Sequence, residues 1–169
     1  LLEEGDYTLK EVQAPYGYVK ELEGKAFHVG EDYNGWDNSL VIEFSNMPQK
    51  ATITVAKIDS WTGDEVDESV YIVKAAETIQ TPDGTIRAHE GEIVATLTTG
   101  EDGKATTPEL YLGTYTVYEA KAKDGYALDV VEKTVALEYA GQKVAVYDHE
   151  EAVTNTPTDP KIKKVDARR

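Results

Sequence analysis

The chain has 169 residues, 40% of them hydrophobic, and a formal net charge of -15. This length allows one or two domains, and the apolar fraction is sufficient for a packed core. The negative charge argues against binding to nucleic acid or to an anionic membrane surface, because both need a basic face. The absence of cysteine excludes disulfides, thiolate metal sites and a cysteine nucleophile.

Membrane insertion is not expected in this segment. No apolar run approaches the roughly 20 residues that a membrane-spanning helix needs. The first residues, LLEEGDYTL, lack the basic start and apolar centre of a signal peptide. We therefore expect any targeting or anchoring signal to lie outside this chain.

Short runs of alternating apolar and polar residues predict β-strands along the whole chain. The clearest runs are 51–59, 69–76, 92–99, 114–121, 132–139 and 142–147. Glycine-containing turn signals separate them, for example at 81–84, 100–103 and 123–125. Residues 77–92 lack a clear strand pattern, and we expect an exposed connection there with room for a short helix. Many short strands with regular turns are typical of a β-sandwich.

The sequence repeats itself at an offset of 108 residues, from position 5 to position 113. Residues 5–11 (GDYTLKE) and 113–119 (GTYTVYE) share Gly, Tyr, Thr and Glu in register. The similarity continues into the following loop, where Ala14, Gly17 and Tyr18 fall on Ala122, Gly125 and Tyr126. A repeat of this length indicates tandem modules.

A second pair of segments sets the module boundaries. SNMP (45–48) precedes AKID (56–59), and TNTP (154–157) precedes KKVD (163–166), as if one module ended and the next began. We therefore predict that residues 1–48 are the C-terminal part of a first module and 49–158 a complete second module. Residues 159–169 would be a linker and the opening strand of a following module.

Three polar residues fall on the apolar faces of predicted strands, where every second side chain points to the same side. They are Lys57, Glu119 and Asn155. Each alone has an ordinary explanation, such as a lysine that reaches the surface at a strand end. Their joint presence in one module predicts a functional group. The apolar residues of the same parity are Ile53 and Val55 for Lys57, Tyr115 and Val117 for Glu119, and Val153 for Asn155.

The same residue types recur in the incomplete modules. Glu11 and Asn46 have the parity of their apolar neighbours in the first module, and Lys164 has that of Ile162 in the opening strand of the third. The neighbouring Lys163 is the alternative to Lys164. The lysine of the first module is expected before residue 1.

Away from water the charged forms of lysine and glutamate are both disfavoured. A neutral lysine is a nucleophile. Held near the Asn155 carboxamide, Lys57 would attack its carbonyl carbon while protonated Glu119 polarises the oxygen and relays protons. The predicted product is an amide between the two side chains, with release of ammonia. By analogy with disulfides, closing such a loop would stabilise the module by about 4 to 5 kcal/mol.

The segments YTLKEVQAPYGY and YTVYEAKAKDGY resemble the E-box region of CnaB-type (SpaA-like, prealbumin-like) isopeptide-forming domains of Gram-positive surface proteins and pilins. VAKID and VTNTP are similar to the segments that carry the family's bond-forming lysine (here Lys57) and asparagine (Asn155), and Glu119 matches its catalytic acid. The resemblance implies an all-β, inverse Greek-key β-sandwich, with one complete module and part of a preceding one.

The resemblance also implies a structural stalk role in an adhesin or pilin, outside the cell and attached to the cell wall. Neither an LPxTG signal nor a pilin-linking lysine motif is visible, so both kinds of protein stay open. The expected partners are neighbouring modules of the same chain, and a host surface protein or glycan stays open as a further partner. We expect no cofactor, no metal and no turnover catalysis.

A carbohydrate-binding β-sandwich is the main alternative function, because Tyr33, Trp36 and Trp61 could form a stacking surface. Residues 32–38 carry oxygen ligands at short spacing but lack the glutamate arrangement of an EF-hand, so a solvated hairpin loop is expected there. A hydrolase is disfavoured, since the three histidines show no metal-ligand spacing and no serine nucleophile is recognisable. They are His28, His89 and His149.

Overall fold

The structure is a computed structural model that describes residues 2–30 and 40–158. All elements in this part of the chain are β-strands, so the prediction of an all-β fold is confirmed. Across the described residues, no helix meets the length and hydropathy that a membrane span requires.

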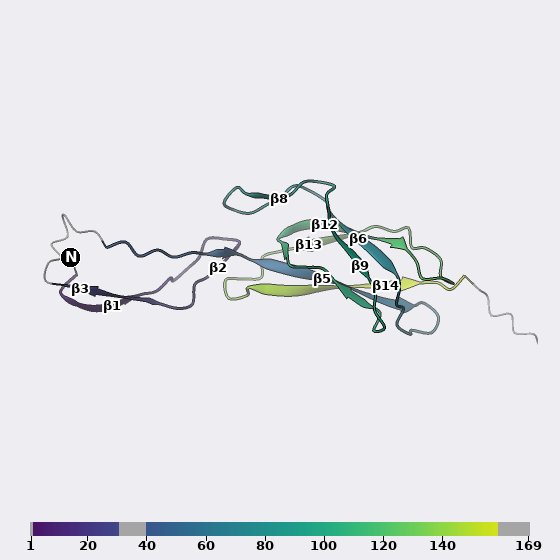
Figure 1. Cartoon of the computed structure of the whole chain (residues 1–169), viewed down its shortest axis with the longest axis horizontal. Coiled ribbons are helices and arrows are strands. Elements are labelled where there is room, and N and C mark those ends of the chain that lie inside the picture. Colours follow the sequence, from purple (N-terminus) through teal and green to yellow (C-terminus); the bar gives the residue numbers. More distant parts are fainter. Residues whose placement is uncertain (1, 31–39, 159–169) are drawn as a thin grey trace, which may run out of the picture. The chain divides into compact units, whose positions relative to one another are not determined.

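Contacts divide the chain into two compact units. Unit 1 comprises Leu1–Gln49 and Tyr139–Ala145, and unit 2 comprises Lys50–Glu138 and Val146–Arg169. Figure 1 labels most of the strands of the two units. The division into modules 1–48, 49–158 and 159–169 stays a prediction.

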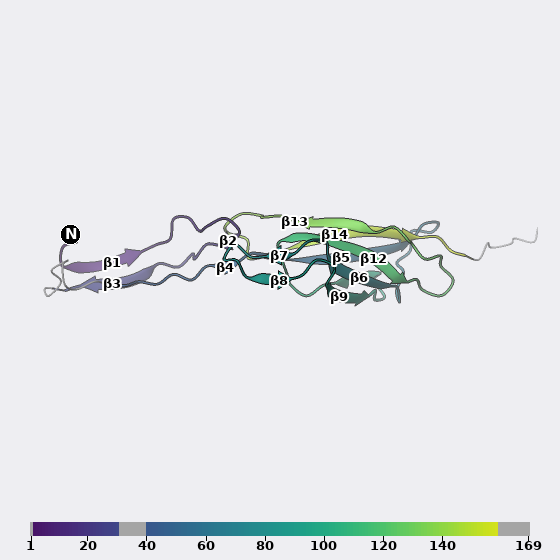
Figure 2. The same cartoon turned by 90° about the horizontal axis from the view of Figure 1, so that it is seen from above.

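Unit 2 contains two four-stranded sheets and one two-stranded hairpin (Figures 1 and 2). In the first sheet, β5 (Lys50–Asp59) pairs antiparallel with β10 (Lys104–Thr106) and β11 (Leu110–Tyr111), and parallel with β14 (Val146–Asn155). The second sheet is antiparallel in the order β13 (Lys133–Leu137), β12 (Gly113–Lys121), β6 (Val70–Ala75) and β9 (Ile93–Thr98).

The alternating apolar residues of both sheets form one core. Full burial of a valine, leucine or isoleucine side chain contributes roughly 1.5 to 3 kcal/mol, so this shared core is the main source of stability. The parallel pairing of β5 with β14 brings the first and last strands of the unit together over ten residue pairs. The core includes Ile53, Val55, Val73, Val117, Val135, Leu137 and Val153.

Five of the six strongest predicted strands are present as β5, β6, β9, β12 and β13, but the strand predicted at 142–147 is wrong. Gly141 has a positive φ of 97°, and the Val144 N–H donates to the Gly141 carbonyl, so these residues form a turn. The strand β14 begins only at Val146. The alternation of apolar and polar residues in the sequence predicted a strand here and gave no sign of the turn.

Residues 77–92 contain a hairpin instead of the expected exposed connection or short helix. Its strands are β7 (Ile79–Gln80) and β8 (Ile86–Ala88). The predicted turn at 81–84 is present, with Gly84 at a φ of 85°. Ile79 and Ala88 are buried in the core of unit 2, which explains why the segment folds back.

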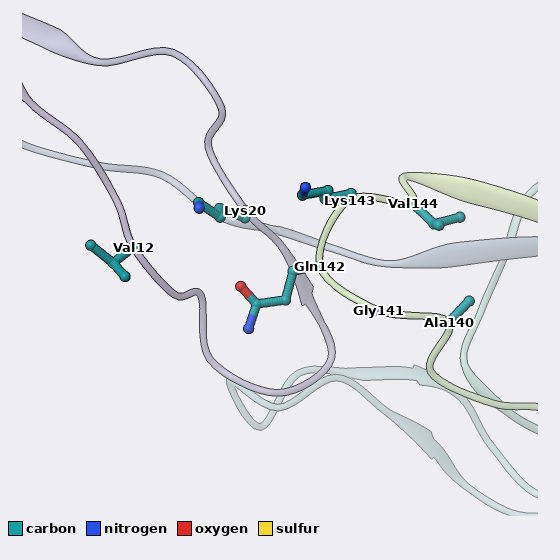
Figure 3. Close-up of a pocket in the computed structure, with 7 residues that line it drawn as sticks. All are labelled: Val12, Lys20, Ala140, Gly141, Gln142, Lys143 and Val144. Atoms are coloured by element: carbon teal, nitrogen blue, oxygen red, sulfur yellow. The ribbon is translucent and has the colours of Figure 1, made fainter.

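Unit 1 has two small antiparallel sheets, formed by β1 (Gly5–Leu9) with β3 (Lys25–Val29) and by β2 (Tyr18–Val19) with β4 (Met47–Pro48). Its segment 139–145 is held by the buried Gln49 side chain, whose Nε2 donates to the Gly141 and Val144 carbonyls. Figure 3 shows a shallow hollow of about 440 Å³ beside this segment. Seven residues line it: Val12, Lys20, Ala140, Gly141, Gln142, Lys143 and Val144.

Candidate cross-linking site

The structure brings Lys57, Glu119 and Asn155, here called the trio, together inside unit 2. They lie on β5, β12 and β14, and their exposed fractions are 1%, 4% and 2%. Lys57 pairs with Val153 in the parallel register, and Asn155 follows two residues later on the same face. Strand parity alone is therefore sufficient to turn all three side chains inward.

Glu119 lies at the centre of the trio. Its Oε1 accepts a hydrogen bond from Lys57 Nζ at 3.0 Å and another from Asn155 Nδ2 at 2.9 Å. Asn155 Nδ2 also lies 3.0 Å from Glu119 Oε2. The carboxyl group thus contacts both the amine and the carboxamide.

Burial lowers the pKa of Lys57 from its ordinary value of 10.5, because the charged ammonium loses its hydration. The hydrogen bond and charge of Glu119, and the charge of Asp129, oppose this shift. The effect of burial is the larger one, so the pKa of Lys57 is lowered and the neutral amine is favoured. Breaking such a buried pair by removing one partner would leave an uncompensated polar group, which is strongly destabilising.

The Asn155 carbonyl oxygen has no hydrogen-bond donor. Among the buried side-chain atoms of the described chain, only Asn155 Oδ1 and Ser69 Oγ lack a partner. An unsatisfied buried acceptor costs about 1 to 3 kcal/mol. The carboxamide is therefore held through its nitrogen alone, and its oxygen is free to receive a proton donor.

Gly103 packs closely against the β5 backbone at Lys57. The Lys57 N–H donates to the Gly103 carbonyl at 2.8 Å. Gly103 has a φ of 68°, and a Cβ there would lie 2.4 Å from the Lys57 carbonyl oxygen. Only glycine combines this positive φ with such a close approach.

Two neighbours of the trio were missed from the sequence. The Tyr71 hydroxyl lies 2.6 Å from Lys57 Nζ and donates to Glu119 Oε1 at 3.5 Å. The backbone N–H of Asp129 donates to Glu119 Oε2 at 2.8 Å. Tyr71 lies at an inward-facing position of its strand, but this is true of any tyrosine in the core, so the pattern does not mark it as functional. No side-chain pattern could identify the main-chain donor at Asp129.

Unit 1 contains a related pair. Asn46 Nδ2 donates to Glu11 Oε2 at 2.8 Å, and the Glu21 N–H donates to the same oxygen at 2.7 Å. Glu11 and Asn46 are half-buried, and within the described residues no lysine bonds to Glu11. Lys164 lies outside the described residues.

The described residues cover only part of the alternative sites. Trp61 is 59% exposed in unit 2, whereas Tyr33, Trp36 and the loop 32–38 lie outside the described residues. His28 pairs with Asp6, and His149 lies 3.3 Å from Glu151. No group of three or more His, Asp or Glu side chains suited to a metal ion occurs in the part of the chain that is described.

Comparison with known proteins identifies a family and several similar folds. Residues 51–151 match the family model described as "SpaA: Prealbumin-like fold domain". Among solved structures, the Bacillus anthracis TIE protein matches 92% of this chain with a TM-score of 0.65 and 23% identity. No curated protein matches the sequence.

Two pilins have a related fold. The group B streptococcus pilus 2b backbone protein matches 88% of this chain with a TM-score of 0.51 and 22% identity. The major pilin SpaD of Corynebacterium diphtheriae matches 64% with a TM-score of 0.50 and 20% identity. The matched regions span 26%, 52% and 30% of the TIE protein, the pilus 2b protein and SpaD, respectively.

Proposed function

Because the chain belongs to the family of SpaA prealbumin-like fold domains, we propose that it is a structural stalk segment of a Gram-positive pilin or surface adhesin. In this proposal, unit 2 is stabilised by an amide bond between Lys57 and Asn155, with Glu119 as the catalytic acid. The supporting observation is the buried, hydrogen-bonded trio. Two proteins of similar fold are pilins, which supports a role outside the cell.

The reaction begins with one proton shift along the 3.0 Å hydrogen bond from Lys57 to Glu119. This single step produces both the neutral amine and the protonated acid. A half-turn of the Asn155 carboxamide exchanges its nitrogen and oxygen, so that Glu119 donates to Oδ1 and polarises the carbonyl. Such a hydrogen bond strengthens as negative charge develops on the oxygen.

Bond formation then proceeds by addition and elimination. Lys57 Nζ attacks Asn155 Cγ, and the Nζ–Cγ bond forms. Glu119 accepts a proton from Nζ and delivers one to Nδ2. The Cγ–Nδ2 bond breaks, and Nδ2 leaves as ammonia. Counted from the neutral amine, one proton moves from Nζ to Nδ2. Glu119 ends as the protonated acid that the first proton shift produced, and no cofactor or oxidant is needed.

The amide would carry tension across the unit. Lys57 lies near the start of unit 2 and Asn155 near its end, 98 positions later. A force applied along the chain would pass through the bond between β5 and β14 and leave the enclosed core unloaded. The neighbouring modules of the same chain are the proposed partners, with a host surface protein or glycan as a further one.

Intact mass tests this proposal. The unsubstituted chain is expected to be one ammonia lighter than its sequence, and Lys57→Ala, Glu119→Ala and Asn155→Ala are expected at full mass. Peptide mapping should recover residues 57 and 155 in one cross-linked peptide. Lys104→Ala is the control, because this exposed lysine of unit 2 pairs with Glu150 and has no contact with the trio in the described residues. A full mass for the unsubstituted chain would refute the bond.

A further inference from the structure

Tyr71 is the only tyrosine in the described chain whose hydroxyl bonds to a member of the trio. It lies on β6, directly opposite Glu119 in the antiparallel register. We propose that Tyr71 is a further catalytic residue of the cross-linking reaction, which aims the lone pair of the Lys57 amine at the Asn155 carboxamide. This inference rests on the function proposed above.

A neutral amine has a defined geometry. Its nitrogen carries the side-chain carbon, two hydrogens and one lone pair in a tetrahedral arrangement. Lys57 Nζ has two acceptors, Glu119 Oε1 at 3.0 Å and the Tyr71 hydroxyl oxygen at 2.6 Å. Once the proton that Glu119 has received points to Asn155 Oδ1, Glu119 Oε1 can accept again from Lys57 Nζ. With both amine hydrogens held, the lone pair has a single remaining direction. One acceptor alone would leave the amine free to rotate about its last carbon–nitrogen bond.

Tyr71 is fixed as the acceptor of this pair. Its own hydrogen points toward Glu119 Oε1 at 3.5 Å, so its oxygen lone pairs remain for Lys57. Burial, followed by the nearby charges of Glu119 and Asp129, raises the pKa of Tyr71 far above its ordinary value of 10.0. The hydroxyl therefore stays neutral and does not become a phenolate that would hold the lysine protonated.

Tyr115 provides a matched control within the same unit. Its side chain is 2% exposed, compared with 3% for Tyr71. Its hydroxyl donates to the Tyr111 carbonyl at 2.6 Å and, within the described residues, bonds to no member of the trio. Tyrosine to phenylalanine at either position removes one buried hydroxyl and about 1 kcal/mol of hydrogen bonding. Only Tyr71→Phe also releases the lysine amine.

The test measures the rate of bond formation. Full-length chain from cell-free synthesis is collected in denaturant, folded by dilution and quenched at intervals, and the loss of ammonia is followed by intact mass. Folding is followed in parallel by circular dichroism. Tyr71→Phe is expected to slow the reaction by about 10²-fold, the cost of a small misplacement of reacting atoms. Tyr115→Phe should react at the unsubstituted rate.

The pH dependence separates aiming from proton transfer. If Tyr71 only orients the amine, Tyr71→Phe slows the reaction by the same factor at every pH at which the chain folds. A factor that changes with pH overturns the aiming role, as does equal slowing by Tyr115→Phe or no slowing by Tyr71→Phe. If the unsubstituted chain forms no bond, the proposed function itself is refuted. This result differs from the ones above, in which the bond forms but Tyr71 does not aim the amine.

Discussion

The backbone N–H of Asp129 donates to Glu119 Oε2 at 2.8 Å, from a position ten residues further along the chain. In unit 1 the Glu21 N–H donates to Glu11 Oε2 at 2.7 Å over the same spacing. The internal repeat therefore extends to a main-chain contact. In unit 2 this donor holds Oε2 and leaves Oε1 to face Lys57.

We predict that Asp129→Pro slows the cross-linking reaction. Proline has no N–H, so Glu119 Oε2 loses its main-chain donor and the carboxyl group gains freedom to turn. A hydrogen bond to a charged group contributes about 1.5 to 3 kcal/mol, which corresponds to a rate loss of about tenfold or more. The refolding assay with intact mass measures this rate directly.

Two control variants isolate the N–H group. Asp129→Ala keeps the donor and should react close to the unsubstituted rate. Val130→Pro perturbs the same loop at an exposed residue whose N–H has no acceptor in the described chain. Equal slowing by Asp129→Pro and Val130→Pro would show that loop order matters and that the individual hydrogen bond does not.

The rate of bond formation should fall as pH rises through the pKa of Lys57, which lies below the 10.5 of an ordinary lysine. The reactive form has one proton on the pair, with the Lys57 amine neutral and Glu119 protonated, and this proton is lost as pH rises through that pKa. Because burial lowers the pKa of Lys57, the loss occurs at a lower pH than for an exposed lysine. Initial rates from intact mass over a pH series check this. A rate that keeps rising through this range would contradict the shared-proton mechanism.

The sequence was sufficient to predict that the three side chains of the trio point inward, because strand parity is a local property. Lys57, Glu119 and Asn155 each follow buried neighbours at a spacing of two, and the structure buries all of them. Tyr71 and Tyr115 show the limit of this reasoning. Both have inward parity and both are buried, but only the pairing of β6 with β12 places Tyr71 beside the amine.

The errors in the strand prediction have a related cause. The segment 142–147 alternates like a strand, but Gly141 starts a turn and the Gln142 side chain binds the Ala14 backbone, which is distant in sequence. The hairpin at 77–92 depends on burial of Ile79 against the core. Contacts of this kind are set by the tertiary structure, and no local pattern contains them.

Loss of the bond should lower thermal stability. Glu119→Gln preserves the shape of the side chain but cannot supply the acid, so the chain should fold without the amide. A closed loop of 98 positions accounts for about 4 to 5 kcal/mol, so Tm should fall by roughly 15 to 20 °C. Differential scanning calorimetry measures the difference.

The double variant Glu119→Gln with Lys57→Met is the control for this prediction. Both chains lack the bond, but the double variant has no buried amine left beside a neutral partner. If the missing amide causes the loss, both variants should melt well below the unsubstituted chain. A double variant that regains the unsubstituted Tm would assign the loss to the unpaired lysine.

The end of β5 offers a prediction that does not depend on the cross-link. Asp59 is buried, and its Oδ1 accepts the N–H groups of Trp61 and Thr62 at 2.7 and 3.0 Å. Its Oδ2 accepts the Tyr126 hydroxyl at 2.9 Å. This hydrogen bond is the main cause of the raised pKa of Tyr126. One carboxylate therefore organises both the turn and the neighbouring loop.

Asp59→Ala should destabilise unit 2 more than Tyr126→Phe. The alanine variant leaves two turn N–H groups and a hydroxyl without their acceptor, at about 1 to 3 kcal/mol, whereas Tyr126→Phe loses one net hydrogen bond of about 1 kcal/mol. Urea unfolding in the Glu119→Gln background measures both, because a chain without the amide unfolds completely. Equal losses from the two variants would mean that the turn N–H groups find water as a full substitute for Asp59.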